Sequence, residues 1–508
     1  MKTIKRILCL ALAVLMLFSV VACTGGNKQK GTTAKPGETT EPENRYDDLP
    51  DDLDFGGKEI KLLSIVQTAN VNSFAAERSG DVIDNAVYDR NVNLEKRLNC
   101  VINVEERTYG NDDVMYTEMQ NLAGNPTYHI LAHACYKMVK LAVEGMLVDL
   151  ASQEFVDLDK DYYDDGYNSA LNAGGRQYLV TGKMTIAWYR YQIVTLFNRN
   201  LFKKANIDLS SPYQTVIDQK WDVAEMQRIA NMLYIDLDED GNYNEADQYG
   251  YFIFVGSSSS QTDGFMGAFN LHLINKSEDG YYMLDPTYSP DPWVIAVNNY
   301  LDLLGAVGTY QSNSVGNPGV VAKFTAEEAG MINYRMYVVE EDAMVTLSRK
   351  KEGYGILPLP KASVEQPDYV SYVQDQVIVF GITATWSGED LVMCGQFLEA
   401  FASESYNTTM PAYYEKALTK KYVYDEPSKK MIEIIDSNIV VDPVNVYYGS
   451  YFNFHTGTLR TAYDLNGTNK PVNTILASAI GGGAFQERID KLNASLKELD
   501  ATLKAQGK

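Results

Sequence analysis

The sequence contains few cysteines and few histidines. Five Cys and four His occur among 508 residues, and neither a C-x-x-C pair nor an H-E-x-x-H pattern is present. These absences exclude a disulfide scaffold and a Cys-rich zinc site, and they argue against a zinc hydrolase. The chain also lacks a G-x-S-x-G nucleophile elbow and a G-x-x-x-x-G-K-[ST] phosphate loop. Paired glycosidase carboxylates cannot be singled out among 67 acidic residues.

Positive charge is scarce as well. The chain has 44 Lys and Arg against 67 Asp and Glu, which gives a net charge of −23. Such a balance argues against nucleic acid as a partner and against a polybasic membrane-binding surface. Apolar residues make up 45% of the chain and charged residues 22%, so most of it can bury a core. The length predicts two to four ordinary domains or two large lobes.

No apolar run is long enough to span a bilayer. The longest covers residues 7–22, follows Lys2, Lys5 and Arg6, and ends at Cys23, which is typical of an export signal. Val20-Val21-Ala22-Cys23 resembles a bacterial lipobox, in which the cysteine receives lipid and becomes the mature N-terminus. Residues 1–23 are therefore predicted to be a lipoprotein signal peptide, with a plain secretory signal as the alternative. The protein is expected to be anchored to the membrane without spanning it.

Residues 24–57 are predicted to be a flexible tether, because the segment begins with polar and small residues that can bury nothing. The folded part is expected from Lys58 onward. Cys100, Cys135 and Cys394 remain in it, and an odd number leaves at least one thiol unpaired. We expect buried, inert thiols at all three positions. The sequence does not decide whether two of them form a disulfide.

Strand and helix patterns alternate after the tether. Strands are expected at 60–66, 100–105 and 128–135, and helices at 81–98, 112–123 and 137–147. This order predicts an α/β, parallel and doubly wound sheet, whose ligands bind at the carboxyl ends of the strands. Tyr136 follows the third strand and is therefore a candidate ligand contact. Later patterns predict strands at 177–182 and 192–198, and helices at 222–233, after a Ser387 cap, and at 485–503.

Several segments, in this order behind the lipobox, carry a family resemblance. They are Lys58–Val66, TLFNRNLFKKANI (195–207), KWDVAEMQRIANML (220–233), Phe324 with Ala329-Gly330-Met331, YGILPLPK (354–361) and WSGEDLVMCGQFLEAFAS (386–403). Over residues 58–506 the chain resembles the bacterial extracellular solute-binding proteins of ABC importers, the family of maltose-binding protein. The resemblance implies a two-lobed, type II periplasmic-binding-protein-like fold with a multi-segment hinge. Lobe 1 would comprise 58–192 and 361–409, and lobe 2 would comprise 193–360 and 410–508.

The segment DLDEDGNYNEAD, residues 236–247, matches the calcium loop of EF-hands except at its last position. Gly241 stands where such a loop turns sharply, and Asp replaces the usual bidentate Glu at the end. A strand pattern follows the loop, so an isolated loop with a structural calcium ion is predicted, with a solvated acidic turn as the alternative. The predicted ligands are Asp236, Asp238, Asp240, Asn242 through its carbonyl, and Asp247.

Aromatic residues gather in three stretches that the resemblance places near a ligand cleft. Aromatic rings can stack on the apolar face of a pyranose, while its hydroxyls need fixed polar partners. The alternative is that about half of these rings pack in the core. The predicted ligand-binding residues are Tyr136, Trp188, Tyr189, Arg190, Tyr191, Tyr334, Arg335, Tyr337, Gln374, Asp375, Tyr447, Tyr448, Tyr451 and Phe454, with Gln192, Asn333 and Asn453 as further polar candidates.

The resemblance implies a lipid-anchored solute-binding protein on the outer face of the cell membrane. It would capture a carbohydrate, most simply an oligosaccharide, and deliver it as a monomer to an ABC permease, without a covalent step. Alternatives are a binding protein for another solute such as a peptide, an extracellular lipoprotein glycosidase, and an adhesin. An acidic ligand would need Arg190 or Arg335 as its anchor.

Overall fold

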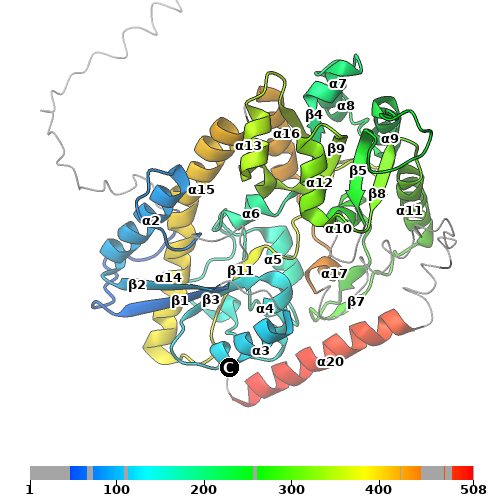
Figure 1. The fold of residues 1–508 in the computed structure, drawn as a ribbon. Coiled ribbons are helices and arrows are strands. Elements are labelled where there is room, and N and C mark those ends of the chain that lie inside the picture. Colours follow the sequence, from blue (N-terminus) through cyan, green and yellow to red (C-terminus); the bar gives the residue numbers. More distant parts are fainter. Residues whose placement is uncertain are drawn as a thin grey trace, which may run out of the picture. The chain divides into compact units, whose positions relative to one another are not determined.

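The computed structural model describes residues 46–506, except 66–72, 108–111, 256–259, 424, 448–473 and 475–482 (Figure 1). The chain divides into two compact units, Met1–Glu41 and Pro42–Lys508, and the description concerns the second. The predicted signal peptide, Cys23 and the tether as far as residue 45 lie outside the described residues. Within the described part, no helix has both the length and the apolar character needed to cross a bilayer.

The first sheet has four strands in the order β11-β3-β1-β2. They are β1 (Glu59–Ile65), β2 (Val101–Arg107), β3 (Ile130–Ala134) and β11 (Ile378–Ile382). Strand β1 runs parallel to β2 and β3, with Leu62 opposite Val104 and Ile130. The prediction of an all-parallel sheet is wrong at one edge, where β11 pairs antiparallel with β3. That strand returns from far along the chain, and an antiparallel edge on a parallel sheet is common.

The helices of this sheet are α2 (Val82–Leu98), α3 (Asp112–Ala123), α4 (Cys135–Val143) and α14 (Gly388–Asn407). Helix α2 begins where the Asp81 carboxylate accepts the Ile83 N–H at 2.8 Å, and it ends at Asn99 in the left-handed region. The chain passes from β1 to β2 and back beyond β1 to β3, so right-handed crossovers place α2 and α3 on opposite faces. Ser387 precedes α14, but its side chain makes no capping hydrogen bond, contrary to expectation.

The second sheet has the order β10-β4-β9-β5-β8. Its strands are β4 (Ile193–Asn198), β5 (Tyr249–Phe254), β8 (Thr309–Ser312), β9 (Ala329–Arg335) and β10 (Tyr354–Leu357). Strand β4 is antiparallel to β9 and β10, whereas β5 is parallel to β8 and β9. Gly250 and Gly308 allow helix α9 (Val223–Leu233) to lie close against this sheet, because a Cβ at either position would lie 2.0–2.2 Å from the Ala230 carbonyl oxygen.

A two-stranded hairpin and further helices complete the chain. The hairpin is β6 (Ile274–Lys276) with β7 (Tyr282–Leu284). The remaining helical segments are η3 (Leu150–Ser152), α5 (Asp165–Leu171), α6 (Ala187–Arg190), α7 (Arg199–Lys204), α8 (Ser211–Ile217), α10 (Ser260–Ala268), α11 (Pro290–Leu304), α12 (Gly316–Thr325), η4 (Met336–Glu340), α13 (Asp342–Ser348), α15 (Thr409–Pro411), η5 (Ala412–Tyr422), α16 (Glu426–Ser437), α17 (Pro443–Val446) and α20 (Ala484–Ala505).

Helix α20, red in Figure 1, packs along its apolar stripe against the rest of the unit. Phe485, Ile489 and Leu492 are fully enclosed, and the helix contacts β7 and α4. Asn493 exchanges two hydrogen bonds with the backbone of Tyr282, at 2.7 and 3.0 Å. The regular spacing of apolar residues along this helix therefore reflects packing against the same chain.

The packed chain begins before the predicted boundary at Lys58. Leu49 and Phe55 are buried, and the buried Asp47 carboxylate lies 2.6 Å from the Arg97 guanidinium. The tether prediction is therefore wrong for the end of the segment 24–57, because these side chains have partners in the core. The expected strand at 177–182 is also absent, and only a single bridge joins Val180 to Phe380.

The three described cysteines carry free, buried thiols. Burial raises the pKa of Cys100 and Cys394 to about 12, and burial also raises the pKa of Cys135. A thiol with a raised pKa is a poor nucleophile at neutral pH. These residues therefore serve packing, as expected, and no disulfide joins them.

Candidate functional site

Three segments that lie far apart in the sequence meet where β4 begins. The Ile193 N–H donates to the Tyr372 carbonyl at 2.9 Å, and the Gln374 N–H donates to the Tyr191 carbonyl at 3.0 Å. The Met336 N–H donates to the Gln192 carbonyl at 2.8 Å. We call this region the crossing site and define it as residues 135–136, 188–193, 333–337 and 372–376.

The fourth segment of the crossing site follows strand β3. The Tyr136 N–H donates to the Asp375 carbonyl at 3.2 Å, which places Tyr136 beside a second predicted ligand-binding residue. The neighbouring Cys135 thiol lies 3.9 Å from the Val446 carbonyl, so the stretch containing Tyr447 also approaches the site. The structure thus brings together predicted residues from four parts of the chain. The remaining predicted residues Tyr448, Tyr451, Asn453 and Phe454 lie outside the described residues.

Most of the aromatic rings at the crossing site are enclosed. Trp188 has no exposed surface, and its ring lies edge-on to Tyr167 with centroids 6.0 Å apart. Tyr191, Tyr334 and Tyr447 are also buried. The predicted stacking of a sugar on Trp188 therefore has no free ring face in this structure. The partly exposed rings are Tyr136 and Tyr337, and Tyr337 lies edge-on to Tyr191 and to Tyr334.

Arg190 is held by a buried ion pair that sequence reasoning missed. Its Nε and Nη2 atoms each lie 2.9 Å from a carboxylate oxygen of Glu340, and the Tyr413 hydroxyl donates to Glu340 at 2.7 Å. Burial lowers the pKa of Arg190, but the attraction of Glu340 outweighs it and the pKa is raised overall. The two-donor edge of Arg190 is therefore occupied by Glu340, and its Nη1 donates to the Ser73 hydroxyl at 3.3 Å, so this edge cannot also bind a carboxylate of a ligand.

A second acid, Asp436 of α16, also lies beside the crossing site. Its carboxylate lies 3.0 Å from the Lys183 ammonium and accepts from the Tyr189 hydroxyl and the Gln192 amide, each at 3.3 Å. Burial and this neighbouring carboxylate raise the pKa of Tyr189, so its hydroxyl stays protonated and donates. Neither Asp436 nor Glu340 stands in a recognisable motif, and no sequence signal marks them.

Several buried polar atoms of the crossing site have no hydrogen-bond partner among the described residues. Such an atom costs about 1–3 kcal/mol when nothing satisfies it, so native proteins contain few. All belong to residues that the sequence analysis singled out. The atoms are Trp188 Nε1, Gln192 Oε1, Asn333 Nδ2, Arg335 Nε and Gln374 Oε1. The site therefore holds donors and acceptors of both kinds that a polar ligand or water could satisfy.

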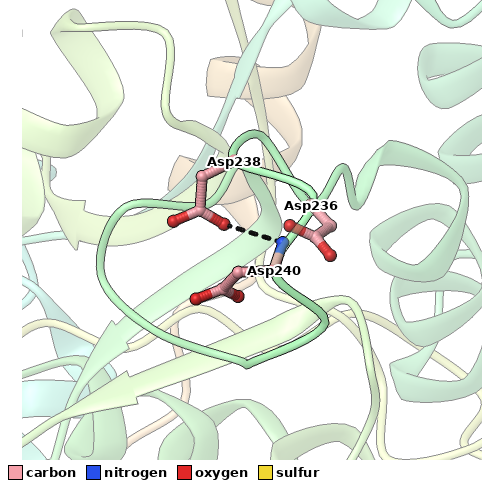
Figure 2. A group of neighbouring side chains, drawn as sticks. All are labelled: Asp236, Asp238 and Asp240. Atoms are coloured by element: carbon pink, nitrogen blue, oxygen red, sulfur yellow. Dashed lines mark hydrogen bonds between the residues drawn. The ribbon is translucent and has the colours of Figure 1, made fainter.

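The acidic loop groups three of the five predicted calcium ligands. Figure 2 shows the carboxylates of Asp236, Asp238 and Asp240 on one loop, and their oxygens lie within 4.8 Å of one another. Gly241 has a φ of +75° and donates its N–H to Asp236 at 2.9 Å, which closes the turn that the motif requires. Desolvation and the neighbouring carboxylates of Asp240 and Asp236 raise the pKa of Asp238.

The last position of the loop differs from the prediction. Asp247 is not part of this triplet, and its buried carboxylate accepts the Leu237 N–H at 3.2 Å and the Tyr249 hydroxyl at 3.3 Å. These contacts tie the loop to strand β5. The Asn242 side chain donates to Asp240 at 3.0 Å. The loop thus uses Asp247 for its own backbone, and the short side chain does not reach the triplet.

A model of the family described as bacterial extracellular solute-binding protein matches residues 102–406, which is more than half of the chain. No curated protein matches the sequence.

Three solved structures are similar to this chain at low sequence identity. The galacto-N-biose-/lacto-N-biose I-binding protein of the ABC transporter from Bifidobacterium longum is 12% identical and has a TM-score of 0.56, with 86% of this chain and 98% of that chain covered. An ABC substrate-binding protein from Listeria monocytogenes, solved in complex with cycloalternan, is 14% identical with a TM-score of 0.52, and the coverage is 87% and 99%. The sugar-binding protein MalE from Xanthomonas citri is 12% identical with a TM-score of 0.52, and the coverage is 88% and 98%.

At these identities the likeness shows the fold, which is the two-lobed type II α/β fold of periplasmic binding proteins. The strand order of the two sheets describes the fold, and the match over residues 102–406 identifies the family. The chain belongs to the family of bacterial extracellular solute-binding proteins.

Proposed function

We propose that this protein captures an oligosaccharide outside the cell and delivers it to the membrane subunits of an ABC importer. Family membership supports an exported binding protein. Two of the similar structures are named for, or were solved with, a saccharide, lacto-N-biose in one and cycloalternan in the other. Peptide binding, glycosidase activity and adhesion find no comparable support.

One observation carries the proposal. Five buried polar atoms of the crossing site have no hydrogen-bond partner among the described residues, and three of them belong to Gln192, Asn333 and Gln374, which the sequence analysis selected as polar partners for hydroxyls. They lie among tyrosine rings such as Tyr191, Tyr334 and Tyr337. A saccharide offers hydroxyls that both donate and accept, together with an apolar C–H face for aromatic rings. This ligand class satisfies both features of the site.

The proposed mechanism is binding followed by closure, with no covalent step. The crossing site joins segments of both sheets, and hinge residues of this kind absorb the rotation of one lobe relative to the other. The ligand would bind the open form, and closure would exclude water from its hydroxyls. The closed form would then dock on the permease as a monomer. The lipobox at Val20–Cys23 supports attachment to the outer face of the membrane through lipid on Cys23.

A calcium ion in the loop of residues 236–247 is part of the same proposal. The motif and the three clustered carboxylates of Asp236, Asp238 and Asp240 support it. The remaining oxygen ligands would come from the Asn242 carbonyl and water, since Asp247 is engaged elsewhere. The ion would fix the connection between α9 and β5 and would take no part in ligand capture.

The proposal is tested by thermal denaturation of the purified protein with panels of oligosaccharides and short peptides. A ligand present at about 100 times its Kd adds about 2.7 kcal/mol to the free energy of unfolding, so the melting temperature should rise with one saccharide series. Tyr337→Ala should weaken this shift. Tyr243→Ala removes an exposed ring of the acidic loop, outside the crossing site, and should leave the shift unchanged. A shift with peptides alone would contradict the proposal, and so would conversion of the saccharide to products.

A further inference from the structure

Three arginines are buried in the described part of the chain, and two have evident partners. Arg190 pairs with Glu340 through two contacts of 2.9 Å. Arg90 donates from Nη2 to the Phe74 carbonyl at 2.9 Å, and its guanidinium lies 4.3 Å from the centre of the Phe401 ring. The partners of Arg90 are neutral, but its Nε is also engaged, by the Asn91 side-chain oxygen at 3.0 Å, so neither arginine has a buried nitrogen without a partner.

Arg335, the third buried arginine, differs. Its residue is only 8% exposed, and its one hydrogen bond to the described residues runs from Nη1 to the neutral side-chain amide oxygen of Gln376 at 2.7 Å. Its Nε has no partner, and no described carboxylate lies within ion-pair distance. Two other arginines also have an unpartnered Nε, but each has a carboxylate partner, Asp47 for Arg97 and Asp425 for Arg199. An uncompensated buried charge is costly, so proteins rarely keep one without a use.

The geometry leaves one particular edge of Arg335 without a hydrogen-bond partner. The Nη1 corner is used by Gln376, so the opposite edge, formed by Nε and Nη2, makes no hydrogen bond to the described residues. That edge can donate two parallel hydrogen bonds to a carboxylate. The rings of Tyr334 and Tyr337 lie 5.5 and 5.0 Å from the guanidinium carbon and stabilise its charge, but they accept no strong hydrogen bond.

Two other cations nearby are paired with carboxylates. Glu340 neutralises Arg190 and Asp436 neutralises Lys183, at 2.9 and 3.0 Å. Arg335 is therefore the arginine of the crossing site without a described carboxylate at ion-pair distance, and Glu341 attracts it only from farther away. The net charge of −23 disfavours anions at long range. An anionic group at this site must be held by a local contact, and Arg335 offers one.

We infer that Arg335 binds a carboxylate of the ligand and that the captured solute is an acidic oligosaccharide containing uronic acid residues. This inference rests on the proposed function, because it specifies the ligand of the same site. The Nε atom is covered in this structure, so the carboxylate reaches it when the segments of the crossing site separate and is enclosed when they close. Enclosure strengthens a charge-assisted hydrogen bond, because the surroundings then screen it less.

The test compares acidic and neutral forms of the same saccharide by calorimetric titration of the intact protein. The probes are oligosaccharides of galacturonate, glucuronate and mannuronate, their methyl esters, and the matching neutral sugars. Hydrogen bonds to a charged group contribute about 1.5–3 kcal/mol, so the acid of the recognised series should bind about tenfold or more tightly than its ester. Arg335→Gln should remove this preference, and Arg349→Gln, at an exposed arginine, should preserve it.

The outcomes separate the inference from the proposed function. Equal affinity for acid and ester, or binding of neutral sugars alone, would overturn the role of Arg335 while the proposed function stands. Binding of sulfated saccharides but not uronates would overturn the assignment to a carboxylate. Binding of peptides alone would refute the proposed function itself. If Arg335→Gln does not fold, the affinities of the unaltered protein for acid and ester still test the inference. Arg335→Lys then tests whether the two parallel hydrogen bonds from Nε and Nη2 are required.

Discussion

The buried ion pair between Arg190 and Glu340 allows a quantitative prediction. Replacing Glu340 by Gln keeps the size of the side chain and an acceptor oxygen for Arg190 Nε, but it removes the negative charge. The Arg190 side chain is 8% exposed and that of Glu340 is 17% exposed. Removing one partner of a buried pair costs about 3–5 kcal/mol, because the other charge stays buried without compensation. We place the loss for Glu340→Gln near the lower end, at about 3 kcal/mol, since water retains some access.

The assay is urea denaturation followed by tryptophan fluorescence. A shifted midpoint with an unchanged slope reports a change in stability alone. Asp390→Asn is the matched control, because Asp390 lies 2.9 Å from Lys58 but the two side chains are 46% and 53% exposed. An exposed pair of this kind contributes about 0–1 kcal/mol.

Replacing both partners should restore most of the stability. In Arg190→Met with Glu340→Leu neither charge of the pair remains, and apolar side chains of similar volume often stabilise such a position as well as the ion pair did. If Glu340→Gln costs no more than Asp390→Asn, the Arg190 charge has another partner and the electrostatic account of the crossing site is wrong. If the double variant is less stable than Glu340→Gln, the ion pair itself is required and apolar side chains cannot replace it.

Two further predictions concern the acidic loop and helix α14. Chelation of calcium with EDTA should lower the melting temperature, and Asp236→Ala with Asp238→Ala should abolish that response. An unchanged melting temperature after chelation would show that the loop is a solvated acidic turn without a bound ion. Burial raises the pKa of Glu399 from 4.5 to about 7, with hydrogen bonds from Tyr162 and Tyr163 opposing the shift. Its contribution to stability is thus present below pH 4.5 and is lost as the pH rises through 7. Unfolding free energies at pH 5 and pH 8 should differ less in Glu399→Gln than in the unaltered protein.

The first sheet was largely predictable because its signals are local. Asp81 marks the start of α2, and the apolar residues of that helix recur with the period of one buried face. The predicted helix at 112–123 coincides with α3. The antiparallel direction of β11 could not be predicted in this way, since it depends on how a distant part of the chain returns to the sheet. The missing Ser387 cap has the same origin, because a capping residue predicts a hydrogen bond that tertiary contacts can displace.

The candidate site was predictable as a set of segments but not as a set of contacts. The stretches around Tyr191, Tyr334 and Gln374 do meet, and the resemblance alone led us to expect this. The burial of Trp188 was not predictable, because ring exposure depends on neighbours such as Tyr167 that lie elsewhere in the chain. The position of Asp247 outside the carboxylate triplet could not be foreseen for a related reason, since a carboxylate at the end of a loop can bind the backbone as well as an ion.

The two arginines show why charge at the site required the structure. Arg190 and Arg335 both follow a tyrosine and stand near another, so their local sequences do not distinguish them. Glu340 ends η4, the short helix that follows Arg335 directly, and proximity in sequence would assign it to Arg335. The helix instead directs Glu340 to Arg190, where the carboxylate is fully engaged. Arg335, although nearer in sequence, keeps the neutral Gln376 as its hydrogen-bond partner, and Glu341 attracts it only from beyond ion-pair distance. Among the described residues, Arg335 is thus the arginine of the crossing site that lacks a directly paired carboxylate.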